Sequence, residues 1–184
     1  MYFLLDVDST VNNNPQKERG QNSHVSLILG ESLDAEKDDL ELPYRFEMSV
    51  DEGEEPVIHA WYPGSNIMQQ SMVDALHAAG VDNLQVFPAE VKREGSGDDV
   101  PGFVVVNIVG AVACADMSKS NAQPLADVSY FRDLVIDAKK TRDLLLFRVA
   151  ESSMLVLVHE KVATQLKAAT LAGLTLTPVK ESTD

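Results

Sequence analysis

The sequence predicts an α+β domain of mixed α/β character, with one largely antiparallel mixed sheet and helices packed on it. Strand patterns occur along the whole chain, and helical periodicity is confined to two stretches. Each of these stretches leads into a glycine, a short strand and a proline. The length of 184 residues is that of one domain, so we expect a single domain over residues 1–184.

Strands are expected where short apolar or alternating runs are bounded by turn residues. Residues 44–50 alternate apolar and polar side chains with the period of a half-buried strand. The β-branched run at residues 103–109 predicts a central strand. Other strands are expected at residues 2–7, 57–62, 84–87, 134–136, 144–149, 154–158 and 174–179. Residues 125–133 have no clear pattern.

Two stretches have the apolar spacing of helices. Over residues 67–79, apolar side chains recur at steps of three and four, with Ser65 or Asn66 as the expected cap and Gly80 as the end. The second stretch covers residues 159–172.

The two helical stretches have a similar continuation. Gly80 is followed by a strand that we expect to end at Pro88, and Gly173 by a strand that we expect to end at Pro178. The likeness indicates either a duplicated unit or two solutions to the same turn.

The charge of the chain is strongly negative and unevenly distributed. Twenty-nine acidic against fifteen basic residues give a net charge of −14, and residues 31–55 alone hold eleven acids against Lys37 and Arg45. Such a field repels nucleic acids and anionic membranes, and it accelerates the encounter with basic partners. An acidic surface can also serve only to keep a protein soluble, and both interpretations stay open.

Composition also bears on where the protein acts. No apolar run approaches the roughly 20 residues of a membrane-spanning helix. The first residues lack the basic segment of a signal peptide, and their apolar run is broken by Asp6 and Asp8. The single cysteine, Cys114, excludes an internal disulfide and a multi-cysteine metal site. We therefore expect a cytoplasmic protein.

One motif suggests catalysis. An apolar run ends in Asp6, and the Asp-x-Asp-x-Thr pattern that starts there resembles the first motif of the haloacid-dehalogenase phosphatases. In that family the two aspartates serve as nucleophile and as general acid or base, with magnesium between them. The chemistry also needs a lysine and a downstream acidic pair at other strand ends. The pair Asp98–Asp99 follows a polar loop instead, so a magnesium-dependent phosphatase is only an alternative.

Other catalytic and metal-binding patterns are incomplete. The segment that begins at His159 and Glu160 is similar to a zinc-protease helix, but Ala163 occupies the position of the second histidine. The chain has no glycine-rich phosphate loop at the start of a helix and no Gly-x-Ser-x-Gly motif. We therefore expect no catalytic residues, no metal site and no cofactor.

A series of motifs in the second half resembles a known family. In chain order they are Val81–Pro88, Gly102–Asn107, Asp116, Leu146–Arg148 and Gly173–Val179. This order resembles the immunity-protein domain of bacterial polymorphic-toxin systems, in the family first described as a myxobacterial domain of unknown function. There a helix leads to "agvdnlqflPv", a "gyyvvNv" strand and an aspartate, and then to "iFR". The resemblance covers residues 60–180.

The resemblance implies a stoichiometric inhibitor that binds a cognate toxin and blocks it. The acidic excess suits a basic toxin such as a nuclease, and an effector-loading adaptor is the alternative among binding proteins. From charge and aromatic character we expect these residues to meet the partner: Asp34, Glu36, Asp38, Asp39, Asp51, Glu52, Glu54, Glu55, Trp61 and Tyr62. Packing in the core is an equally good interpretation of Trp61.

Overall fold

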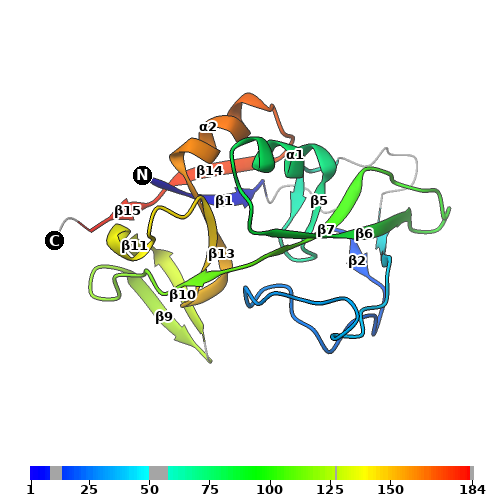
Figure 1. Ribbon diagram of the computed structural model, residues 1–184, viewed down its shortest axis with the longest axis horizontal. Coiled ribbons are helices and arrows are strands. Elements are labelled where there is room, and N and C mark those ends of the chain that lie inside the picture. Colours follow the sequence, from blue (N-terminus) through cyan, green and yellow to red (C-terminus); the bar gives the residue numbers. More distant parts are fainter. Residues whose placement is uncertain (9–13, 50–57, 127, 183–184) are drawn as a thin grey trace.

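The computed structural model describes residues 1–8, 14–49, 58–126 and 128–182 (Figure 1). Within these residues the protein is mainly β, with strands in four sheets and two α-helices, α1 (Gln70–Ala78) and α2 (Glu160–Ala168). The predicted α+β class is therefore wrong. Apolar spacing overestimates the helices, because Ile67–Gln69 form a strand and α2 ends at Ala168. Neither described helix is long and apolar enough to cross a membrane.

The larger sheet has six strands. Their order across the sheet is β2 (Gln16–Lys17), β3 (Tyr44–Met48), β6 (Leu84–Arg93), β7 (Phe103–Ile108), β5 (Ile67–Gln69) and β4 (Trp61–Tyr62). The β-branched strand β7 pairs antiparallel with both β6 and β5, so its prediction as a central strand is confirmed.

The second sheet has five strands, and two small sheets stand beside it. The order in the five-stranded sheet is β14 (Leu174–Pro178), β1 (Tyr2–Val7), β13 (Ser152–His159), β12 (Leu146–Val149) and β8 (Ala111–Val112). One small sheet is the antiparallel hairpin β9 (Asn121–Leu125) and β10 (Val128–Asp133). The other pairs β11 (Val135–Ile136) with β15 (Lys180–Glu181) in parallel, and a 3-10 helix, η1 (Ala138–Lys140), follows β11.

The two segments with similar sequence patterns also share a topology. β5 leads directly into α1 and then β6, and the antiparallel strand β7 lies between β5 and β6. In the same way β13 leads into α2 and then β14, and β1 lies between them, antiparallel to both. α1 and α2 lie side by side along one edge of the molecule (Figure 1). The likeness therefore extends from sequence to fold, as a duplicated unit requires.

Pro88 does not end its strand, contrary to the prediction. Residues 84–88 of β6 pair with β7, whereas residues 89–93 pair in parallel with β3. Proline has no N–H to donate to a neighbouring strand. Pro88 therefore lies at the point where β6 changes from pairing with β7 to pairing with β3. Pro178, in contrast, is the last residue of β14, as predicted.

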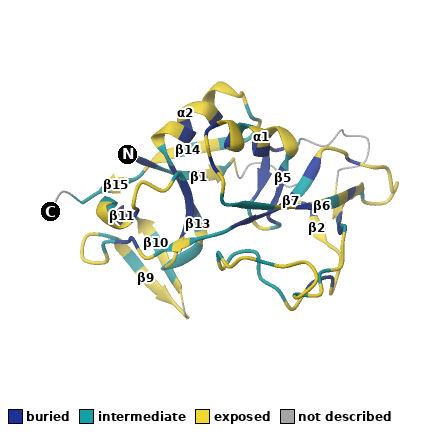
Figure 2. Ribbon diagram, in the orientation of Figure 1, coloured by how far each residue is buried: buried dark blue, intermediate teal, exposed yellow. Residues whose placement is uncertain are grey.

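The main apolar core lies between the helices and the two large sheets. It contains Trp61, residues of α1 such as Leu76, residues of α2 such as Leu166, and Val158 of β13. Burying a side chain of this size contributes roughly 1.5–3 kcal/mol, so this cluster is the principal source of stability. Figure 2 shows the corresponding strands as buried and the outer faces of the helices as exposed.

Gly173, which follows α2, is required by a close contact. Its φ is +68°, and a Cβ atom there would lie 1.7 Å from Nδ1 of the buried His59. A larger residue would be strained and would displace the imidazole. The glycine thus lets the segment before β4 pack against the turn between α2 and β14.

Candidate partner-binding surface

A long loop without regular secondary structure, residues 18–43, joins β2 to β3 and carries four of the predicted partner-binding acids. Two buried amides hold its ends together. Gln21 donates from Nε2 to the carbonyl oxygen of Pro43 at 2.7 Å and accepts a backbone N–H of β3 at 2.8 Å. Asn22 accepts the N–H of Glu41 at 2.8 Å and donates to its carbonyl oxygen at 3.0 Å. These hydrogen bonds satisfy backbone groups that have no partner in a neighbouring strand, and they fix the path of the loop.

The middle of the 18–43 loop is attached to the six-stranded sheet. Gln85 of β6 accepts the N–H of Leu33 at 2.8 Å and donates to its carbonyl oxygen at 2.7 Å. Asn107 of β7 donates to the carbonyl oxygen of Glu31 at 2.7 Å and to Oε1 of Gln85 at 2.9 Å. The asparagine of the family motif therefore positions the loop. Sequence reasoning missed this role because a single buried amide in an apolar strand does not indicate its partner.

A close backbone contact completes the attachment. The N–H of Gly110 donates to the carbonyl oxygen of Gly30 at 2.8 Å, and a Cβ atom on Gly30 would lie 2.9 Å from the carbonyl carbon of Gly110. Gly30 has a φ of +76°, so glycine is favoured on both grounds. Leu27, Leu33 and Leu40 pack against the apolar cluster of the six-stranded sheet.

The predicted acids of the loop fall into two groups. Asp34 accepts the backbone N–H groups of Glu36 and Lys37 at 3.1 Å each, and Asp38 accepts that of Asp34 at 2.7 Å. These two carboxylates therefore stabilise a turn. Glu36 and Asp39 are exposed, and they direct negative charge to solvent from a fixed backbone.

Arg45 of β3 binds two further acids of the loop. Its Nη2 donates to Glu41 and its Nε donates to Glu18. The pKa of the Arg45 guanidinium is raised from its ordinary value, first by the hydrogen bond to Glu41 and then by that to Glu18. Two carboxylates of the loop are thus locally neutralised, whereas exposed acids such as Glu36 and Asp39 keep their negative charge.

The remaining predicted site residues are placed differently. Asp51, Glu52, Glu54 and Glu55 lie outside the described residues. Trp61 is 2% exposed and belongs to the main core, and Tyr62 is 5% exposed and belongs to the cluster of the six-stranded sheet. In this conformation neither ring faces a partner. The structure therefore does not bring the aromatic pair together with the acidic loop on one accessible surface.

Arg148, the arginine of the "iFR" motif, is buried between the two large sheets. Its Nη2 donates to Oδ1 of Asn66 at 2.8 Å, and its Nη1 donates to the carbonyl oxygen of Ser153 at 2.9 Å. Burial lowers the pKa of this guanidinium to about 10. Asn66 lies in the turn between β4 and β5, so the arginine joins β12 of one sheet to the edge of the other. Its role is structural.

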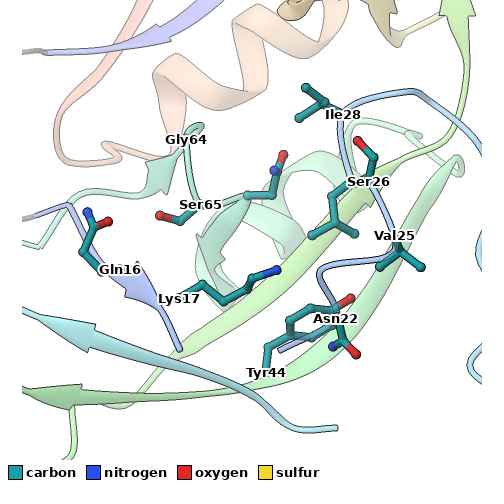
Figure 3. A pocket seen from close by; sticks show the side chains of 11 residues that line it. Gln16, Lys17, Asn22, Val25, Ser26, Ile28, Tyr44, Gly64 and Ser65 are labelled. Carbon is teal, nitrogen blue, oxygen red and sulfur yellow. The ribbon is translucent and has the colours of Figure 1, made fainter. Parts of the chain in front are cut away.

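A pocket of about 390 Å³ opens beside the 18–43 loop (Figure 3). Lys17, Asn22, Tyr44 and Ser65 contribute polar groups, and Lys17 is the one basic side chain in the lining. Burial lowers the pKa of the Lys17 ammonium and raises that of the Tyr44 hydroxyl, whereas Asn22 favours ionisation of the tyrosine. No carboxylate or histidine belongs to this described lining, so the pocket offers a cation and neutral polar groups.

The residues of the two catalytic patterns, the aspartates at the end of β1 and the His159 segment, make local hydrogen bonds in the structure. Asp6 accepts the N–H of Val7 at 2.8 Å at the end of β1. In the described parts of the chain, neither it nor Asp8 belongs to a group of three potential metal ligands. His159 is the N-cap of α2, where its Nδ1 accepts the N–H of Lys161 at 3.3 Å.

Comparison with known proteins identifies the family. The model of the immunity protein family (Imm11) matches residues 2–181, which includes the 18–43 loop as well as the motifs of the second half. Among curated proteins, no match is found. Because the family model covers nearly the whole chain, the protein belongs to the Imm11 family of immunity proteins.

Proposed function

We propose that this chain binds a cognate bacterial toxin by direct protein–protein contact and neutralises it without catalysis. The observation that carries the proposal is the family match over residues 2–181. The matched range includes the acidic 18–43 loop, which lies outside the motifs at residues 60–180. The match therefore supports a role in the immunity function for the loop as well as for the second half of the chain. The buried roles of Asn107 and Arg148 agree with this, because the motifs hold a scaffold and leave the surface to a partner.

The charge of the 18–43 loop supports a basic partner. The chain carries a net charge of −14, and the loop presents Glu36 and Asp39 from a backbone that hydrogen bonds hold in place. Ordered charge of one sign steers a protein of opposite charge toward the surface. We propose that the toxin is basic, as a nuclease is around its phosphate-binding cleft, and that the two proteins meet in the cytoplasm of the producing cell.

Co-expression with the toxin encoded beside its gene tests the proposal. Cells that carry the toxin alone should stop growing, whereas cells that carry both should grow, and the two purified chains should co-elute. An effector-loading adaptor would co-elute with the toxin but leave the cells unprotected. If the cells are not protected and the two chains do not co-elute, the proposal that this chain binds the toxin is wrong. Magnesium-dependent hydrolysis of a generic phosphoester that Asp6→Asn abolishes would make the chain an enzyme instead.

Charge reversal tests the steering role of the loop. The double variant Glu36→Lys, Asp39→Lys should associate with the toxin more slowly than the wild type and with a weaker dependence on salt, because both residues act at long range. Stopped-flow association rates over a series of salt concentrations measure both effects. The matched control reverses Asp74 and Asp82, on the side of α1, and should associate at nearly the wild-type rate. Equal rates for the two double variants would show that the acidic loop only solubilises.

A further inference from the structure

The hairpin of β9 and β10 presents apolar side chains to solvent. In its register Leu125 lies opposite Val128, and Gln123 lies opposite Tyr130. Side chains opposite each other or two residues apart along a strand share a face, so these four residues lie on one face of the hairpin. Leu125 is 63% exposed, Val128 41% and Tyr130 58%.

The opposite face and the base of the hairpin are attached to the rest of the molecule. Phe131 is half-buried, and the N–H of Ser129 donates to the carbonyl oxygen of Glu151 at 2.7 Å. At the base, Ser120 Oγ accepts the N–H of Val135 at 3.0 Å and donates to its carbonyl oxygen at 3.1 Å. Asp133 also binds Lys180 at 2.7 Å. The apolar face therefore belongs to an anchored element, and its exposure is a feature of the folded chain.

The hairpin projects on the same side of the molecule as the 18–43 loop. In Figure 1 both lie on the side away from α1 and α2, the hairpin below β13 and the loop below β6. Figure 2 shows most of the hairpin as exposed. The hairpin and the acidic loop thus project from one side of the protein, whereas the helices occupy the other side.

This combination fits the general anatomy of a protein interface. Stable interfaces have an apolar centre in which a few side chains, tyrosine prominent among them, carry most of the binding energy, and a polar rim. An apolar face on a chain of net charge −14 fits a partner with an apolar patch beside basic residues. Membership of the Imm11 family of immunity proteins makes a toxin the partner that we propose.

We propose that Leu125, Val128 and Tyr130 form the apolar contact with which this chain binds the toxin, while the acidic loop lies at the rim. The proposal rests on the proposed function and assigns the surface for it. Tyr130 is the central anchor, because its ring is the largest side chain on the face. The hairpin is the part of the chain that enters the partner's surface.

The test compares truncations of exposed side chains on the hairpin and elsewhere. Tyr130→Ala should weaken binding of the toxin by roughly 30-fold or more, mostly through faster dissociation, which is the effect of an interface anchor. Leu125→Ala should act in the same direction, and Tyr130→Phe should retain most of the affinity. The control is Val86→Ala, which shortens a side chain of β6 that is 39% exposed, and it should change affinity by less than about threefold. Surface plasmon resonance measures both rates, and thermal unfolding verifies that each variant is folded.

Each remaining outcome has a distinct meaning. If the wild-type chain binds the toxin and Tyr130→Ala binds it equally well, the hairpin proposal is wrong and the proposed function stands. If the wild-type chain does not bind the toxin, both fall together. Light scattering after size exclusion tests a second copy as the occupant. A wild-type dimer that Tyr130→Ala converts to monomers, with unchanged affinity for the toxin, would assign the hairpin to self-association and overturn the proposal.

Discussion

The interior of this protein and its hairpin use side chains in opposite ways. The interior buries polar groups such as Asn107 and Arg148, each of which binds backbone or side-chain atoms of another segment. The hairpin exposes apolar groups such as Leu125 and Tyr130. Buried polar groups cost free energy unless they are paired, and exposed apolar groups leave binding energy unused. The difference shows that paired polar groups fix the positions of segments inside the fold, whereas the hairpin leaves apolar area uncovered on the surface.

The largest expected effect separates the two aromatic candidates. Trp61→Ala removes a buried ring from the main core and should lower the free energy of unfolding by about 3–5 kcal/mol. Tyr130→Ala removes an exposed ring and should lower it by less than about 1 kcal/mol. Chemical denaturation of both variants measures the two values. Similar losses would contradict the comparison, because they would mean that the hairpin ring also supports the fold.

A smaller effect is expected from the polar attachment of the loop. Asn107→Ala leaves the carbonyl oxygen of Glu31 without its donor and should destabilise the protein by about 1–3 kcal/mol. Amide hydrogen exchange should become faster at Leu33, because the Gln85 side chain that accepts its N–H loses the bond from Asn107. Gln123→Ala, on the exposed face of the hairpin, is the matched control and should cost less than about 0.5 kcal/mol. Unchanged exchange at Leu33 in the Asn107 variant would show that the remaining contacts hold the loop without Asn107.

The smallest expected effect concerns Cys114, which is buried against the five-stranded sheet. Burial raises the pKa of the Cys114 thiol to about 12, with Glu151 acting in the same direction. A thiol whose pKa is higher in the folded than in the unfolded state stabilises the fold fully below the unfolded pKa, near 9, and loses that contribution as pH rises toward 12. The wild type should therefore lose stability faster between pH 9 and pH 11 than Cys114→Ala does. Parallel pH dependences would show that the thiol ionises as easily in the folded state.

Alkylation gives an independent measure of the same thiol. Iodoacetamide should leave folded Cys114 unmodified at pH 8 and should modify it in denaturant, because the thiolate is the reactive form. Rapid modification of the native protein would mean that this part of the interior opens to solvent.

The sequence predicts elements well where one pattern dominates. The β-branched run of β7 and the apolar runs of β1 and β13 are found as expected, since burial on both faces leaves few alternatives. Ile67 and Met68 mislead because two apolar neighbours fit the start of a helix and a three-residue strand equally well. The resulting excess of helix gave the wrong fold class. Pro88 misleads because a change of strand partner has no signature in the local sequence.

The partner-binding surface is harder to predict for a physical reason. The acidic character of Glu36 and Asp39 is visible in composition, but the bonds of Gln21 and Asn22 that hold their loop depend on residues far along the chain. The hairpin has no clear pattern because its apolar side chains face solvent, the reverse of what alternation assumes. The sequence offered one signal for this surface. Residues 125–130 include apolar and aromatic side chains that fit no predicted core position.

The position of β1 has a consequence for how the protein is made. Among the described strands β1 pairs with β13 and β14, so Tyr2 is bonded into the sheet beside His159 and Leu5 lies beside Leu176. A ribosome must therefore synthesise more than 150 further residues before the first strand finds its neighbours. Such long loop closure slows folding and leaves the apolar strand unpaired during translation. The five-stranded sheet therefore closes only after synthesis has reached β14.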